Sequence, residues 1–166
     1  MKTSLILGTA LLCSALTSFA ADFNKAKAGN WHQWRGPDAT GSSTTAQPPV
    51  TWSEDKNIQW KVPMPGYGSA SPIVWGNKVF ILTAVNTGKV DPSLPKPEDQ
   101  PKRIFGITHP NTVYEYVVMC LDRQTGKTLW RQVATQRVPH EGAHGDNNFA
   151  SASPTTDGKR LYCWFS

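Results

Sequence analysis

The chain has 166 residues and a formal net charge of +5, from 17 Lys and Arg against 12 Asp and Glu. These charges are scattered, and no Lys/Arg cluster is interleaved with aromatic residues, so nothing in the sequence predicts nucleic-acid binding. After the N-terminal segment no apolar run is long enough to cross a bilayer, so we expect no transmembrane span.

Residues 1–20 have the pattern of a secretory signal peptide. Lys2 gives a short positive start, and Leu5 to Leu16 form an apolar run that is too short for a membrane span. Ser18 and Ala20 supply the small residues of a cleavage site. We therefore predict cleavage after Ala20 and export to the periplasm or the extracellular space, with an uncleaved anchor as the alternative.

Residues 21–57 carry neither a helical nor a strand period. Gly, Pro, Ser and Thr dominate from Gly36 to Pro49, a composition typical of irregular extended chain. We therefore expect an irregular lead-in before the first folded unit.

Three later segments have the composition of strands: Ile73 to Ala84, Val113 to Leu121 and Arg160 to Phe165. They are rich in Val, Ile, Tyr, Phe and Trp, and they are bounded by turn residues. No window of helical length shows a 3.6-residue period, so the sequence predicts an all-β protein. Residues 86–112 hold five prolines and a charged stretch, which favours a surface insertion between two strands.

An internal repeat connects the two halves of the chain. Ser69-Ala70-Ser71-Pro72 returns as Ser151-Ala152-Ser153-Pro154, at an offset of 82 residues. Trp60-Lys61 returns as Trp130-Arg131, at an offset of 70. Repeats of this kind indicate stacked structural units, and here the insertion lengthens the period.

The most informative stretch runs from Cys120 to Trp130. A polar turn lies between two strand-like segments, and Gly126 can adopt the positive φ that a tight hairpin needs. Asp122 and Thr125 can bond the backbone of the turn, and Trp130 offers a broad surface for packing on a neighbouring unit. We predict a hairpin that turns at residues 123–127.

This stretch closely resembles the tryptophan-docking motif of PQQ-type β-propeller blades, Ala-x-Asp-x-x-x-Gly-x-x-x-Trp. Asp122, Gly126 and Trp130 occupy the motif positions, Thr125 is frequent at its position, and Cys120 replaces the alanine. The segments from Ser71 to Phe80, from Trp31 to Pro37 and from Asn57 to Pro63 are similar to the inner strands and the opening of exported, BamB-like members of this quinoprotein-like family.

The resemblance implies a partial β-propeller of four-stranded antiparallel blades over residues 58–166. About one and a half blades would be present, whereas the family typically has eight, so we expect the N-terminal part of a longer protein. Residues 58–62 would then be an outermost blade strand. Trp60 would either help to close the ring from the N-terminus or pack on the side of the first blade.

Two functions are compatible with the resemblance. The first is a non-enzymatic scaffold whose rim loops bind a protein or a saccharide, and this is the function we expect. The alternative is a quinoprotein dehydrogenase for an alcohol or sugar, with PQQ and Ca²⁺ on the propeller axis. No residue of this chain can be matched to the cofactor-binding positions, so we expect neither cofactor here.

The segment His140-Glu141-Gly142-Ala143-His144 has the spacing of a zinc-protease motif, which needs a helix to direct both histidines to one metal. Pro139 and Gly142 oppose a helix there. We therefore predict a solvated loop without metal or catalytic residues. The metal-binding alternative is a loop site made by His140, His144 and Asp146.

Cys120 and Cys163 are the two cysteines that follow the proposed signal peptide. Export would permit a disulfide between them. Their place in strand-like apolar segments favours two buried thiols instead, and the sequence leaves both readings open.

Overall fold

A computed structural model describes residues 22–101 and 103–165. The predicted signal peptide therefore lies outside the described residues. Residues 22–27 are helical, although the sequence predicted only irregular chain from residue 21. The reason is tertiary: Phe23 in this helix stacks on Trp75, with ring centroids 5.6 Å apart.

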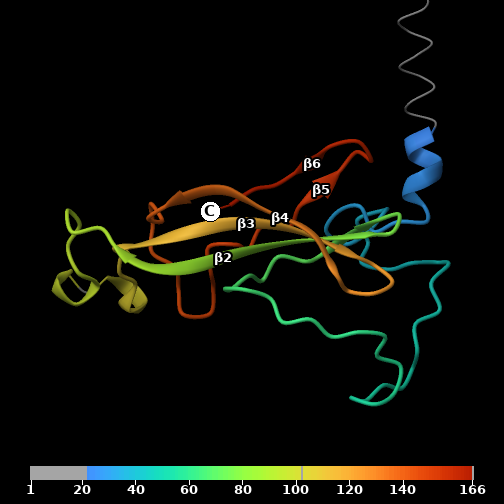
Figure 1. Cartoon of the computed structure of the whole chain (residues 1–166), viewed down its shortest axis with the longest axis horizontal. Coiled ribbons are helices and arrows are strands. Elements are labelled where there is room, and N and C mark those ends of the chain that lie inside the picture. The colour runs from blue at the N-terminus through green and yellow to red at the C-terminus, as the bar shows by residue number, and fades with distance from the viewer. Residues whose placement is uncertain (1–21, 102, 166) are drawn as a thin grey trace, which may run out of the picture.

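A four-stranded antiparallel sheet forms the centre of the molecule, as the all-β prediction required (Figure 1). Its strands follow chain order: β1 (Ile73–Trp75), β2 (Lys78–Val90), β3 (Thr112–Asp122) and β4 (Thr128–Arg137). The predicted strand from Ile73 to Ala84 is in fact a hairpin. Gly76 turns the chain with a φ of 57°, and Trp75 then pairs with Lys78.

The insertion leaves one end of this sheet, between β2 and β3 (Figure 1). It is shorter than the predicted 86–112, because β2 continues to Val90 and pairs there with Thr112. The excursion proper is therefore residues 91–111. It contains two short 3₁₀ turns, η1 (Pro97–Asp99) and η2 (Ile104–Gly106).

The predicted hairpin between β3 and β4 is confirmed, with its turn at residues 123–127. One carboxylate oxygen of Asp122 accepts hydrogen bonds from the backbone N–H groups of Gln124 and Thr125 and from the Thr125 hydroxyl, at 2.8–3.0 Å. The other accepts from Asn77 Nδ2 at 2.6 Å. The Thr125 hydroxyl and backbone contribute most to holding the pKa of Asp122 below its ordinary value.

Side chains alternate between the two faces along β2 and β3, and both faces are largely buried from Val79 to Ala84 and from Tyr116 to Leu121. One face carries Val79, Val117, Met119 and Leu121, and it packs against Trp60 and Met64, which follow the lead-in. The opposite face, which includes Leu82, Ala84 and Val118, packs against Ala150, Phe149, Leu161 and Phe165. The sheet is thus covered by the segment that precedes β1 on one side and by the second repeat on the other.

The two copies of the repeat touch, and one contact joins equivalent positions. Ser71 N–H donates to Oγ of its equivalent, Ser153, at 2.9 Å. Ala70 N–H donates to the carbonyl of Ala150, just before the second copy, at 3.1 Å. A two-stranded sheet of β5 (Thr155–Thr156) and β6 (Leu161–Tyr162) follows. The predicted strand over 160–165 is wrong in length, since only residues 161–162 pair.

Trp60 docks on the β3–β4 turn of the first unit. Its indole Nε1 donates to the Arg123 carbonyl at 2.9 Å, and its ring lies over Gly126, where a Cβ would sit 2.7 Å from Trp60 Cδ2. Residues 58–62 pair with no strand in the described part of the chain, so the predicted outer strand is not formed there. This contact with the β3–β4 turn is local packing of the kind that the sequence left as an alternative.

Cys120 and Cys163 are both free thiols. Cys120 is fully buried between Ile73 and Phe80, and burial raises the pKa of each thiol. Across residues 22–101 and 103–165, no helix has the length and apolar character that crossing a membrane requires.

Candidate binding site on the rim of the sheet

The site lies where the insertion and the loop after β4 meet, at one end of the sheet. Gly142 of this loop rests directly on the Thr108 carbonyl of the insertion, and a Cβ at residue 142 would also lie 2.7 Å from Ile107 Cγ2. His144 packs edge to face against Phe105, with ring centroids 5.7 Å apart. Two segments far apart in sequence therefore form one surface.

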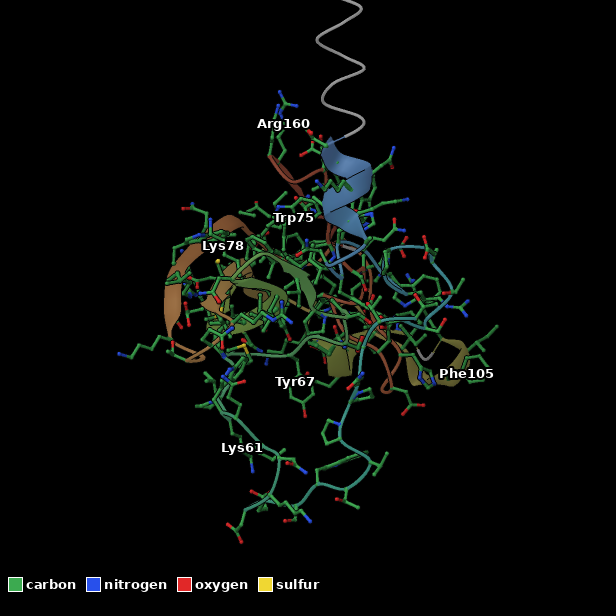
Figure 2. The ribbon with its side chains drawn as sticks, turned by 90° about the vertical axis from the view of Figure 1, so that its right-hand side faces the viewer. Lys61, Tyr67, Trp75, Lys78, Phe105 and Arg160 are labelled. Atoms are coloured by element: carbon green, nitrogen blue, oxygen red, sulfur yellow. The ribbon has the colours of Figure 1, made fainter. Side chains whose placement is uncertain are left out.

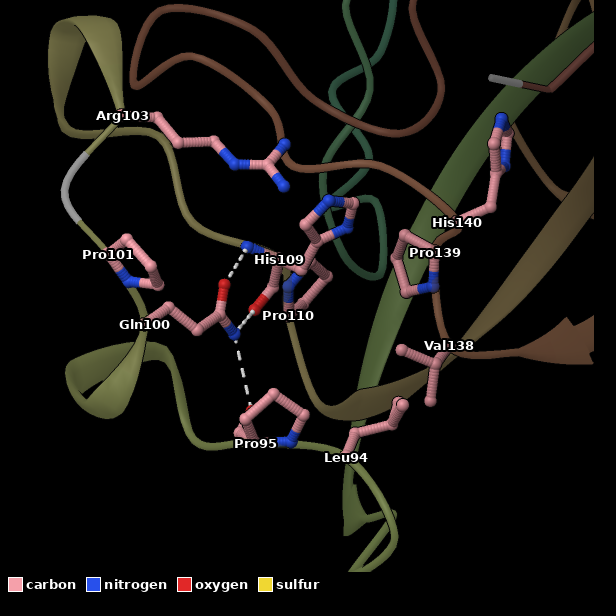
Figure 3. Close-up of a pocket in the computed structure, with 10 residues that line it drawn as sticks. All are labelled: Leu94, Pro95, Gln100, Pro101, Arg103, His109, Pro110, Val138, Pro139 and His140. Carbon is pink, nitrogen blue, oxygen red and sulfur yellow. Dashed lines mark hydrogen bonds between the residues drawn. The ribbon is translucent and has the colours of Figure 1, made fainter.

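Gln100 holds the insertion in shape. Its side-chain Nε2 donates to the carbonyls of His109 (2.8 Å) and Pro95 (3.2 Å), and its Oε1 accepts from the His109 N–H at 2.8 Å (Figure 3). One side chain thus bonds backbone groups that no strand or helix satisfies. The bonds join the two limbs of the excursion and so hold His109 near Gln100 and Pro95.

A cavity of about 480 Å³ opens between these two segments. Its apolar wall consists of Leu94, Pro95, Pro101, Pro110, Val138 and Pro139. The polar side chains in the lining are those of Gln100, Arg103, His109 and His140. The volume falls within the range of about 300–1,000 Å³ that is typical of small-molecule sites, as does the combination of apolar walls with few polar groups.

The cavity is electropositive. Arg103 contributes a guanidinium group, and no carboxylate within the described ranges lies within ion-pair distance of it. Glu141 lines an adjoining hollow that shares Arg103, His109 and His140 with the cavity. The arrangement suits an organic anion whose carboxylate meets the guanidinium while its apolar part lies on the proline rings.

Residues 140–144 contain no helix, as Pro139 and Gly142 indicated. His140 lines the cavity, whereas His144 turns to Phe105 and to Asp146, with 3.5 Å between His144 Nδ1 and Asp146 Oδ2. In the part of the chain that the structure describes, no three His, Cys, Asp or Glu side chains are grouped to hold a metal. His144 and Asp146 thus lie together, whereas His140 lines the cavity.

The docking-motif residues Cys120, Asp122, Thr125 and Gly126 are brought together in the hairpin, but they build structure and do not line the cavity. Trp130, 41% exposed, lies 6.0 Å from Phe80 between ring centroids. The sequence predicted His140 as a candidate residue but neither Arg103 nor His109. Both lie in the proline-rich insertion, which was the signal that could have indicated them.

Comparison with protein-family models finds no match to this chain. No curated protein matches it. No solved structure matches it either.

Proposed function

We propose that this chain is an exported part of a PQQ-like repeat β-propeller and serves as a binding scaffold, with its rim loops as the recognition surface. The observation that carries the binding function is the electropositive cavity between the insertion and residues 138–142. It is built from two loops that contribute nothing to the sheet, and binding residues are commonly placed on loops that a rigid scaffold positions.

The contact between the repeats supports the propeller. When a rotation relates two copies of a unit, equivalent points stay close together only near the rotation axis. Ser71 and Ser153, which are equivalent, are joined by a 2.9 Å hydrogen bond. Trp60 meanwhile docks at the far end of the β3–β4 hairpin. Inner segments that converge and outer tryptophans that dock are what radial stacking of blades requires.

The alternative function, a quinoprotein dehydrogenase, would require PQQ and Ca²⁺. The described residues contain no cluster of carboxylates that would hold the cation. We therefore assign no reaction step to these groups.

Hydrogen exchange of the purified chain distinguishes the two functions. If the chain is a scaffold with the proposed cavity, adding benzoate should slow amide hydrogen exchange over residues 94–110 and 138–142. Benzylamine, a cation of similar shape, should not slow it. Arg103→Gln should abolish the effect, whereas Arg35→Gln, in the lead-in, should preserve it. PQQ with Ca²⁺ should leave residues 69–72 and 151–154 unchanged. Protection of those inner segments by PQQ, or no response of the rim to benzoate, would reject the scaffold with this cavity.

A further inference from the structure

A second cavity on the same rim differs from the first in its chemistry. It has a volume of about 440 Å³ and lies beside the last paired part of β2 and β3. Its lining contains the aromatic residues Tyr67, Tyr114 and Phe149 and the amides Asn86, Asn147 and Asn148, completed by Gly66, Ala84, Ala143 and Gly145. None of these residues is charged, so the cavity offers ring faces and amide groups to a neutral ligand.

Tyr67 is held in an exposed position by its own backbone. Its N–H and C=O exchange hydrogen bonds with Ala84 of β2, at 2.9 and 2.8 Å. On either side, Gly66 lies against the Ala84 carbonyl and Gly68 against the Leu82 carbonyl, so neither position has room for a Cβ. The side chain nevertheless remains 80% exposed and points away from the sheet (Figure 2). The ring of Tyr67 is therefore exposed to solvent, while its backbone is held in place against β2.

Some polar groups around this ring make hydrogen bonds within the protein, and others are left to bind a ligand. Asn148 is used internally, because its Oδ1 accepts from the backbone of Ser69 and Ala150 and its Nδ2 donates to Ser69 Oγ. Asn86 Nδ2 donates to the Tyr114 hydroxyl at 3.3 Å, which leaves that O–H free to donate. The Tyr67 hydroxyl and the Asn147 amide have no side-chain partner in the described part of the chain.

From this combination we infer that the Tyr67 cavity binds a neutral saccharide, an inference that rests on the rim being the recognition surface proposed above. The C–H face of a sugar ring packs on an aromatic face, and its hydroxyls pair with tyrosine hydroxyls and amides, which both donate and accept. The uncharged lining gives no counter-ion to an acidic sugar.

A proline-rich peptide is the competing ligand, since such peptides also dock on aromatic side chains. They require a groove with several ring faces in series. Here Tyr114 and Phe149 pack edge to face with 4.9 Å between centroids, whereas Tyr67 is 80% exposed. A single exposed ring suits a short saccharide that packs one of its rings on Tyr67.

Titration of the chain with cellotriose and maltotriose, followed by saturation-transfer NMR and calorimetry, tests the inference. We expect saturable binding of a neutral trisaccharide and about a tenfold loss in Tyr67→Ala. Trp52→Ala is the matched control, because Trp52 is 69% exposed but lies in the lead-in and outside this cavity. It should bind as the parent chain does. Asn147→Ala should weaken binding without changing the melting temperature.

Three results would overturn the inference: no saturation by either trisaccharide, equal losses in Tyr67→Ala and Trp52→Ala, or binding of decaproline at Tyr67 in place of sugar. Trigalacturonate, an acidic trisaccharide, should bind more weakly than the neutral ones. If the saccharides fail while benzoate still protects the insertion, the scaffold function stands and this inference alone is rejected.

Discussion

Trp60 and Gly126 together connect the segment before β1 to the β3–β4 hairpin. The glycine has a φ of 71° and no Cβ, so the indole can lie flat on the turn and reach the Arg123 carbonyl. The same glycine thus meets two demands, the hairpin conformation and the close approach of the ring. Sequence reasoning anticipated the first demand from the turn itself. The second involves a residue 66 positions earlier, and only the folded chain shows it.

Trp60→Ala should lower the free energy of unfolding of this chain by about 2 kcal/mol, less than the 3–5 kcal/mol for a fully buried tryptophan because the ring is only partly buried. Chemical denaturation measures the loss. Trp52→Ala is the control, since Trp52 is 69% exposed and should tolerate the change. Equally small changes in both variants would mean that the indole adds no packing energy. The role of Trp60 in ring closure remains a prediction for the full-length protein.

His32 makes the stability of the lead-in depend on pH. Its ring is 5% exposed and lies against Phe23 and Trp75, and its Nδ1 has no hydrogen-bond partner within the described residues. Burial is the main cause that lowers the pKa of His32 below 6.5; Lys27 adds to the effect and Asp38 opposes it. The folded chain therefore disfavours the protonated imidazole.

Because the pKa is lower in the folded state, the unfolded chain binds the proton first as the pH falls. The stability contribution of neutral His32 is complete above pH 6.5, decreases between 6.5 and the folded pKa, and stays lost below it. Melting temperatures measured from pH 8 to pH 5 should fall in the parent chain and fall less in His32→Phe. His144→Phe, at a half-exposed position, should keep the parent's pH profile. Parallel profiles for the parent and His32→Phe would contradict this assignment.

At the scale of elements, the insertion and the loop after β4 are joined mainly through Gly142. A methyl group there would meet the Thr108 carbonyl and Ile107, and backbone atoms give way less easily than flexible side chains. Neither segment belongs to a strand, so a change at this contact should affect the two loops and leave the sheet intact.

Gly142→Ala should increase hydrogen exchange over residues 91–111 while β2 and β3 keep their protection, since the substitution separates two loops and leaves the ladder intact. Gly145→Ala is a matched control three residues away, where a Cβ would meet nothing within 4 Å. Unchanged exchange in the insertion of Gly142→Ala would show that the loops are positioned independently.

The sequence was informative where structure is local. The β3–β4 hairpin was predicted because Asp122, Thr125 and Gly126 satisfy the turn among themselves. The rim cavity was not predicted, because it depends on Gly142 meeting Thr108 across 34 residues, and no periodicity reports such a contact. The helix at residues 22–27 was missed for the same reason, since Phe23 packs on Trp75 from a distant strand.

At the scale of the whole molecule, two sheets of unequal strength share one chain. The β2–β3 pair extends over most of two long strands and is buried on both faces, whereas β5 and β6 pair through two residues each. Short two-stranded sheets are marginal without added packing. Two contacts support the β5–β6 pair in this chain. The Thr156 N–H donates a hydrogen bond to the His32 carbonyl, and the Trp75 ring packs on Gly158.

Native-state hydrogen exchange should therefore show two levels of protection, with amides of β2 and β3 exchanging slowest and those of β5 and β6 several orders of magnitude faster. Trp75→Ala should accelerate exchange in β5 and β6 further by removing their support. A single, uniform level of protection across both sheets would contradict this hierarchy and show that the chain opens as one cooperative unit.

The two edges of the main sheet are both closed to further strands. Trp31 exchanges backbone hydrogen bonds with Val74 and so occupies the edge at β1. Along β4, register shifts near Leu129 and Ala134 interrupt the edge, and Arg131 and Arg137 place charges on it. Widening the sheet is thus blocked, while its faces accept another unit. The second repeat accordingly adds to a face of this sheet and leaves its width at four strands.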